Sequence, residues 1–80
     1  MKSYVFKVEL DQEEDGRWSA VVPALLGCNA WGYSAEEALE AVREAAQAYV
    51  ELLIEDGEAV PMENDQAVTV LDGAAIAVST

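Results

Sequence analysis

The sequence predicts an α+β fold with two layers, in which an antiparallel meander of three strands is followed by one long helix and a final strand. Three observations indicate this fold. Two segments of alternating polarity flank an Asp-Gly turn, a long segment repeats its apolar residues at helical spacing, and a short apolar segment follows it. The chain has 80 residues, which suits one domain, residues 1–80, with a single small core.

The first strand is predicted at Ser3–Asp11, where apolar and polar residues alternate with the period of a half-buried strand. One face of this strand carries Tyr4, Phe6, Val8 and Leu10. The charged segment Gln12–Gly16 ends in Asp-Gly, a pair that tolerates the positive φ of a tight hairpin turn. We therefore expect the chain to reverse here.

The second strand is predicted at Arg17–Val22, antiparallel to the first, and its buried face carries Trp18, Ala20 and Val22. Pro23 has no backbone N–H to donate and should end this strand or lie at its edge. A short third strand is predicted at Cys28–Trp31, between two glycines.

The helix is predicted at Ala35–Asp56. Ser34 precedes it as an N-cap, and Glu37 stands three residues later, where its carboxylate can reach back to the backbone amide of the cap. Gly57 is placed for a left-handed C-cap, and Pro61 excludes a longer helix.

The apolar face of this helix is predicted from its spacing of three and four residues. Its centre consists of Leu39, Val42, Ala46, Tyr49 and Leu53, and its margins of Ala38, Ala45, Val50 and Leu52. The opposite face carries Glu36, Glu40, Arg43, Glu44, Gln47, Glu51 and Glu55. The apolar face should pack on one side of the hairpin.

The final strand is predicted at Ala74–Ser79. Its small apolar residues indicate either a strand covered on both faces or a strand beside the first one. Ala67–Leu71 reads as a short strand or as a loop, and Asp72-Gly73 is compatible with a hairpin between these two segments.

The charge is strongly negative, with 16 acidic residues, 4 basic residues and a net charge of -12. Direct binding to nucleic acid is disfavoured, because neutralising phosphates requires clustered Lys and Arg. The acidity suits a basic protein partner and equally suits solubility in a salty cytoplasm. We expect a cytoplasmic protein, since no apolar run approaches the roughly 20 residues that span a bilayer and the only cysteine cannot form an internal disulfide.

The residue types argue against catalysis. The chain has no histidine, so Cys28 lacks the usual general base. Two-metal nucleases use converging carboxylates, but Glu9 lies on the polar face of its strand and the helix carboxylates lie on the face turned away from the sheet. We therefore predict no catalytic residue, no cofactor and no metal site, although a residual metal-dependent nuclease using Glu9 or Asp11 is an alternative to test.

The candidate contacts to a partner are acidic residues and aromatic residues. At the end of the helix the carboxylates oppose the helix dipole, and two of them repel each other one turn apart, which indicates a cationic partner. For Trp18, Trp31 and Tyr33 core packing or a subunit interface is the leading expectation. The predicted contact residues are Glu13, Glu14, Asp15, Trp31, Tyr33, Glu51, Glu55, Asp56 and Glu58.

The order of these motifs resembles the N-terminal domain of the HicB-like antitoxin family. The resemblance covers nearly the whole chain: YVFKVEL, an acidic turn ending in glycine, RWSAVVPALLGCNAWG, SAEEALEAVREA and DGEAVP. The most specific part is VPALLGC followed by a glycine, a capping serine and EEAL. Three positions depart from the family's pattern: Ala24 and Leu26 replace a frequent acidic residue and a proline, and Tyr33 replaces an acidic residue before the cap.

The resemblance implies a partial ribonuclease-H-like fold without the catalytic carboxylates. It also implies a non-enzymatic role in neutralising a small basic HicA-type toxin, a ribonuclease that cleaves mRNA, by occluding its RNA-binding and catalytic surface. Self-association into a dimer or tetramer is expected, and no C-terminal DNA-binding domain is expected. The alternative is an orphan oligomeric module of the same fold that binds other proteins or a small ligand.

Overall fold

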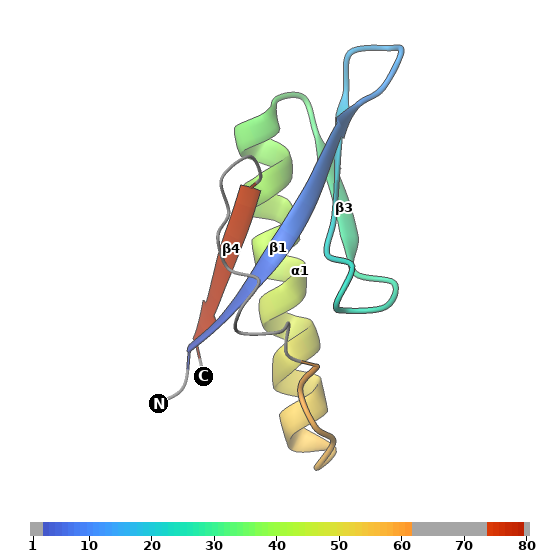
Figure 1. The fold of residues 1–80 in the computed structure, drawn as a ribbon. Helices are drawn as coiled ribbons and strands as arrows, with labels where there is room; N and C mark the ends of the chain where they lie inside the picture. Colours follow the sequence, from blue (N-terminus) through green and yellow to red (C-terminus); the bar gives the residue numbers. More distant parts are fainter. Residues whose placement is uncertain (1–2, 62–73, 80) are drawn as a thin grey trace.

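The computed structural model describes residues 3–61 and 74–79. The described residues form β1 (Ser3–Gln12), β2 (Trp18–Val21), β3 (Asn29–Gly32), α1 (Ala35–Glu55) and β4 (Ala74–Ser79). The strands make one sheet in the order β3-β2-β1-β4 with antiparallel neighbours, and α1 lies across one face of it (Figure 1). The predicted fold is confirmed, whereas the segment 67–73, with its possible strand and hairpin, lies outside the described residues.

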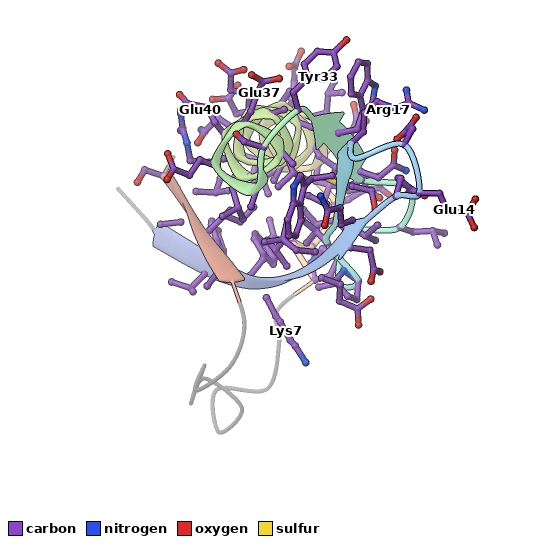
Figure 2. The ribbon with its side chains drawn as sticks, turned by 90° about the horizontal axis from the view of Figure 1, so that it is seen from above. Lys7, Glu14, Arg17, Tyr33, Glu37 and Glu40 are labelled. Carbon is purple, nitrogen blue, oxygen red and sulfur yellow. The ribbon has the colours of Figure 1, made fainter. Side chains whose placement is uncertain are left out.

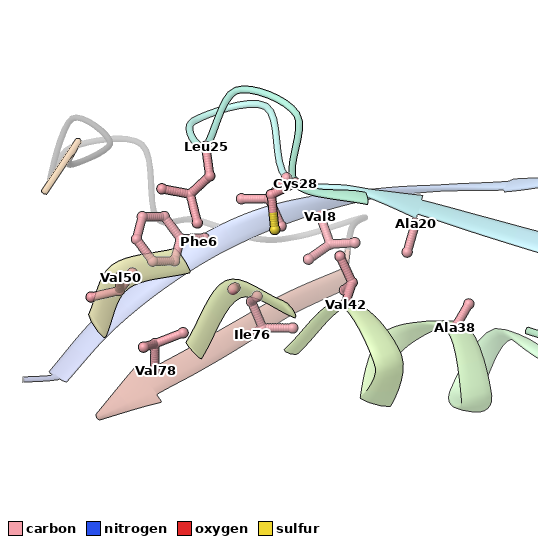
Figure 3. Packing of buried hydrophobic residues seen from close by; sticks show 12 residues of the cluster. Phe6, Val8, Ala20, Leu25, Cys28, Ala38, Val42, Val50, Ile76 and Val78 are labelled. Carbon is pink, nitrogen blue, oxygen red and sulfur yellow. The ribbon is translucent and has the colours of Figure 1, made fainter. Parts of the chain in front are cut away.

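The bounds of β4 are as predicted, whereas β1, β2 and β3 each differ from the prediction by one residue at one end or both. The clearest difference is at β3, which begins at Asn29 instead of Cys28. The cause is two successive turns in the loop after β2. Leu25 N–H donates to the Val22 carbonyl over 3.1 Å, and Cys28 N–H donates to the Leu25 carbonyl over 2.9 Å. These bonds bring Leu25, which is 0% exposed, back into the core beside Phe6 and Cys28 (Figure 3).

The core lies between the sheet and α1. Its buried hydrophobic residues are Phe6, Val8, Ala20, Val22, Leu25, Cys28, Ala38, Val42, Ala46, Val50, Ile76 and Val78. The predicted faces of the first two strands are confirmed. Phe6, Val8, Ala20 and Val22 are buried in this core, and the half-buried Tyr4, Leu10 and Trp18 pack against it. Full burial of Phe6 and its larger neighbours contributes about 1.5–3 kcal/mol each.

The buried face of α1 is rotated from the predicted one. Its fully buried residues are Ala38, Val42, Ala46 and Val50, whereas the predicted centre residues Leu39, Tyr49 and Leu53 are only half-buried. Leu52, expected at the margin, is 60% exposed. The physical reason is close approach: a Cβ on Gly32 would lie 2.6 Å from the Ala38 backbone nitrogen, so small side chains must fill the contact.

β4 lies beside β1 and pairs with it antiparallel, as one of the two predicted alternatives requires. The other alternative, coverage on both faces, is wrong. Ile76 and Val78 are buried against α1, but Ala75 and Ala77 on the opposite face are exposed. Lys7 of β1 points away from the helix on that same side of the sheet (Figure 2).

Both ends of α1 are capped. Ser34 Oγ accepts the Glu37 N–H over 3.1 Å, as predicted, but the Glu37 carboxylate accepts the N–H of Tyr33 over 3.1 Å instead of that of Ser34. At the other end Gly57 has φ +75°, and its N–H donates to the Ile54 carbonyl over 3.0 Å. Glu58 N–H donates to the Leu53 carbonyl over 2.8 Å, which completes a Schellman motif.

Candidate partner-binding surface

The predicted contact residues divide between opposite ends of the molecule (Figure 1). The hairpin end consists of the β1-β2 turn with Glu13, Glu14 and Asp15, and of Trp31 and Tyr33 at the end of β3. The helix end consists of Glu51, Glu55, Asp56 and Glu58 at the C-terminus of α1. The residues that the sequence analysis predicted as one set of contacts therefore lie on two separate surfaces.

The turn of the hairpin end is held by local hydrogen bonds. Gly16 has φ +93°, and its N–H donates to the Glu13 carbonyl over 3.0 Å. Asp15 accepts the Arg17 N–H over 3.0 Å at Oδ1 and the Arg17 Nε–H over 2.7 Å at Oδ2. The backbone N–H of Arg17, assisted by its guanidinium, lowers the pKa of Asp15. Asp15 thus serves the turn itself, while Glu13 and Glu14 are exposed carboxylates.

An aromatic pair lies next to this turn. The Trp31 and Tyr33 ring centroids are 5.5 Å apart at an interplanar angle of 86°, and the Arg17 guanidinium carbon lies 5.2 Å from the centroid of Trp31. Pairing of Ser19 with Trp31 produces this contact, because Arg17 precedes Ser19 on the same face. Trp31 is 53% exposed and Tyr33 is 72% exposed, so core packing is wrong for both, and a subunit interface stays a prediction for them. Core packing is confirmed for the half-buried Trp18.

Carboxylates from two elements lie beside the aromatic pair: that of Glu37 in α1 accepts the Tyr33 N–H, and Glu13 of the β1-β2 turn lines a depression together with Trp31. Glu37 and Glu40 of α1 lie on the same side as Tyr33, and Glu14 lies beyond Arg17 at the tip of the hairpin (Figure 2). A shallow depression of about 320 Å³ on the outer face of β2 and β3 adjoins Trp31. It is lined by Glu13, Arg17, Ser19, Val21, Asn29, Ala30 and Trp31. The hairpin end thus combines exposed aromatic rings with an acidic rim.

The helix end has charge without an aromatic anchor. Glu51 and Glu55 are exposed one turn apart, and the last turn of α1 contains no basic residue. Leu52 is 60% exposed and Ile54 is 45% exposed, but side chains two positions apart on a helix point about 200° apart. They do not form one apolar patch. Asp56 is the C-cap, and the backbone of Glu58 belongs to the Schellman motif.

The remaining reactive groups lie apart from one another in the described residues. Cys28 is 4% exposed, and its burial raises the pKa of the thiol, which keeps it protonated and weakly nucleophilic. Glu9 and Asp11 are exposed on β1, and the helix carboxylates lie on the outer side of α1, so the structure does not bring these groups together. Within residues 3–61 and 74–79, no group of three or more His, Cys, Asp or Glu side chains is placed to hold a metal ion. In the same residues no helix is both long and apolar enough to cross a membrane.

Sequence reasoning missed Arg17, Glu37 and Glu40 as members of the hairpin-end surface. Arg17 has no signal of its own, because its contact with Trp31 depends on the register between β2 and β3. The role of Glu37 was predicted in part. Its distance from Ser34 predicted a helix cap, but did not predict that its carboxylate would accept the backbone N–H of Tyr33.

Several known proteins are similar to this chain. Among curated proteins, a UPF0150 protein of Thermoplasma acidophilum is 38% identical over 65 residues, which cover 81% of this chain and 94% of that protein. A UPF0150 protein of Synechocystis is 39% identical over 61 residues, with coverage of 76% and 77%. One from Archaeoglobus fulgidus is 35% identical over 60 residues, with coverage of 72% and 87%.

Among solved structures, the N-terminal domain of the Burkholderia pseudomallei antitoxin HicB matches with a TM-score of 0.71 and 24% identity, covering 95% of this chain and 96% of that domain. The structure of the antitoxin HicB from the same organism matches with a TM-score of 0.62 and 24% identity. That match covers 100% of this chain and 64% of the antitoxin chain, so this chain is similar in fold to part of that larger protein.

The family comparison agrees with the fold comparison. Residues 4–74 match the model of the HicB-like antitoxin of bacterial toxin-antitoxin systems, a range that includes β2, β3, α1 and nearly all of β1. This match extends over most of the chain, and the relatives above align over the larger part of their own lengths. The chain belongs to the HicB-like antitoxin family.

Proposed function

We propose that this protein binds and neutralises a small basic HicA-type toxin that cleaves mRNA, by occluding the RNA-binding and catalytic surface of the toxin. Membership of the antitoxin family supports a toxin partner, and the net charge of -12 supports a basic one. Complementary charge speeds encounter and disfavours acidic competitors. We place this complex in the cytoplasm, where mRNA is found.

The observation that carries the proposal is the exposed Trp31–Tyr33 pair within an acidic rim. Hot spots of protein interfaces are enriched in Trp, Tyr and Arg, and rigid aromatic side chains lose little entropy on binding. Here the Arg17 guanidinium contacts Trp31, and the Glu37 carboxylate fixes the backbone of Tyr33. We propose the hairpin end as the anchor of the toxin and the carboxylates of the helix end as a peripheral contact.

The first test is co-expression with the product of an adjacent short basic reading frame. We expect the antitoxin to restore growth, to co-purify with the toxin, and to inhibit RNA cleavage by the purified toxin at stoichiometric ratio. Absence of both a complex and a rescue of growth would contradict the proposal.

A second test locates the contact. Replacing the anchors with Trp31→Ala and Tyr33→Ala should weaken toxin binding by about 30-fold, since hot-spot truncations cost about 2 kcal/mol. The matched control is the pair Leu52→Ala and Ile54→Ala, which removes exposed apolar side chains at the helix end and should change the Kd by less than about threefold. Equal losses in both variants, measured by calorimetry on folded proteins, would count against the hairpin end as the anchor.

We also propose that the protein has no nuclease activity of its own. The separation of Glu9 and Asp11 from the carboxylates on the outer side of α1 supports this. Purified protein incubated with RNA or DNA and Mg²⁺ or Mn²⁺ should leave both intact. Cleavage that disappears in Glu9→Gln or Asp11→Asn would assign a catalytic role instead.

A further inference from the structure

Arg17 occupies part of the depression on the outer face of β2 and β3. Its Nε–H donates to Asp15 Oδ2 over 2.7 Å, and its guanidinium carbon lies 5.2 Å from the centroid of the Trp31 ring. Proteins commonly bind an arginine side chain in this way, between a carboxylate and the face of an aromatic ring. Among the described residues that line the depression, Arg17 is the only basic one and Glu13 is the only acidic one.

Both contacts of the Arg17 guanidinium are open to water. The Arg17 side chain is 47% exposed, the Asp15 side chain is 52% exposed, and Trp31 is 53% exposed. Exposed ion pairs and exposed cation–π contacts contribute little to stability, because water and salt compete for the charges. The side chain of Arg17 can therefore leave Asp15 and Trp31 at little cost in free energy.

The groups around the guanidinium do not depend on it for their positions. The Arg17 backbone N–H donates to Asp15 Oδ1 over 3.0 Å, and this bond remains when the side chain moves. The pairing of Ser19 with Trp31 sets the backbone of Trp31, and the Tyr33 ring packs against it with the centroids 5.5 Å apart. The depression therefore keeps its shape without the Arg17 side chain.

We propose that Arg17 is an internal substitute for an arginine side chain of the protein partner, and that the partner's arginine displaces it. The incoming guanidinium lies over Trp31 and bonds to the Asp15 carboxylate, and its aliphatic part lies against Val21 and Ala30 of the depression. Complex formation covers the site, and a cation–π contact is stronger once water is removed. This inference rests on the proposed function for the identity of the partner, but the arginine site can be tested without a toxin.

The acidic residues of the turn favour this exchange. Glu13 lines the depression, and Glu14 lies beyond Arg17 at the tip of the hairpin (Figure 2). Both carboxylates are exposed, so they attract the incoming arginine and are available to pair with the displaced Arg17. Because Arg17 competes with the partner for the same ring, its removal should strengthen binding. If Arg17 itself contacted the partner, its removal would weaken binding.

The first experiment uses the full chain without toxin. The probe is a capped tripeptide, acetyl-Gly-Arg-Gly-amide, and its control replaces the arginine with citrulline, which has nearly the same shape but no charge. NMR follows the indole Nε1–H of Trp31, assigned with the variant Trp31→Phe. The arginine peptide should shift this signal in a saturable way, and the citrulline peptide should not. In Arg17→Ala the arginine peptide should bind about threefold more tightly, because an exposed cation–π competitor has been removed.

The matched control is Arg43→Ala in α1. The Arg43 side chain is 45% exposed and its Nη2 lies 3.8 Å from Glu40 Oε1, so its environment is similar to that of Arg17. Its removal changes the net charge by the same amount, but Arg43 does not line the depression. This variant should change the Kd of the arginine peptide by less than about 1.5-fold at physiological salt. Arg17→Gln, which removes the charge and keeps a polar side chain, replaces Arg17→Ala if the alanine variant unfolds.

The second experiment measures toxin binding to the same variants by calorimetry. Arg17→Ala should lower the Kd of the toxin complex about threefold relative to Arg43→Ala. Peptide binding that requires the arginine and tightens in Arg17→Ala supports the proposal. The proposal is overturned if the arginine peptide does not shift the Trp31 signal, if both peptides bind equally, or if Arg17→Ala binds no more tightly than Arg43→Ala. A toxin that does not bind at all contradicts the proposed function, and the peptide titration then decides this inference alone.

Discussion

The hairpin end and the helix end carry charge of the same sign but hold it in different ways. At the hairpin end the carboxylate of Asp15 is bonded to Arg17, and that of Glu37 is bonded to the backbone of Tyr33. At the helix end Glu55 follows Glu51 by one turn in the absence of a basic residue in the last turn. Carboxylates at the hairpin end are thus bonded to a guanidinium or to the backbone, whereas at the helix end the Glu51 carboxylate accepts a hydrogen bond from the neutral amide of Gln47 and repels Glu55.

The helix dipole sharpens this difference. Glu36 and Glu37 in the first turn of α1 interact favourably with the positive end of the dipole, whereas Glu51 and Glu55 lie towards its negative end. A substitution of a carboxylate at the hairpin end should therefore change stability and binding together. A substitution at the helix end should change stability and binding in opposite directions. The size and sign of the effects of single substitutions test this contrast.

The largest expected effect is at Gly32, where β3 meets the start of α1. In Gly32→Val the Cβ would lie 2.6 Å from the Ala38 backbone nitrogen and 2.9 Å from the Glu37 Cβ, so strand and helix must separate. Overpacking of this kind should lower the free energy of unfolding by about 3 kcal/mol, measured by urea denaturation.

Gly57 at the helix end provides the control for this prediction. A Cβ there meets nothing within 4 Å, so Gly57→Ala suffers only from the positive φ of +75° and should lose about 1 kcal/mol. Equal losses at the two glycines would show that contact with the helix does not set the position of β3.

The next effect in size is the loss of the N-cap. Ser34→Ala leaves the Glu37 N–H without its side-chain acceptor and should lower the free energy of unfolding by about 1 kcal/mol. Ser34→Asp, which restores an acceptor, should recover most of this loss. If alanine and aspartate behave alike, the observed hydrogen bond does not stabilise the helix in solution.

The fold could be predicted because its signals are local. Alternation in β1, the Asp-Gly turn, the capping serine and Gly57 each depend on a few neighbouring residues. The rotation of α1 could not be predicted, because it depends on the contact between Gly32 and Ala38, which are on different elements. Leu25 was missed for a related reason: its burial results from a pair of loop turns, without strand or helix periodicity.

The arrangement of the candidate surface could be predicted only in part. Charge and exposure nominated residues at both ends, but a sequence does not say which of them lie together in space. The arrangement of Arg17, Trp31 and Tyr33 depends on the β2-β3 register. The hydrogen bonds between the Gln47 side chain and the Ser79 backbone depend on the position of β4 relative to α1. Such contacts arise between elements and leave no periodic pattern.

A smaller effect of opposite sign is expected from reversing charge at the helix end. Glu55→Lys removes a repulsion with Glu51, creates an attractive pair at i,i+4, and places a cation near the negative end of the dipole. It should raise the free energy of unfolding by about 0.5 kcal/mol in low salt and by less in high salt. The matched change Glu36→Lys in the first turn should lower it by a similar amount. Effects of the same sign in both variants would contradict the dipole argument.

The smallest effect concerns the titration of Asp15, because this exposed carboxylate interacts mainly with its own turn. Its pKa lies below 3.8, owing first to the backbone N–H of Arg17 and then to the Arg17 guanidinium. A lowered pKa in the folded state stabilises the fold above the unfolded pKa, and that contribution is lost as the pH falls through the folded value. NMR titration of the Asp15 carboxyl carbon should therefore place its midpoint below 3.8. Arg17→Ala keeps the backbone N–H, so part of the lowering should remain in that variant, whereas a return to the full ordinary value would assign the effect to the guanidinium that contacts Trp31.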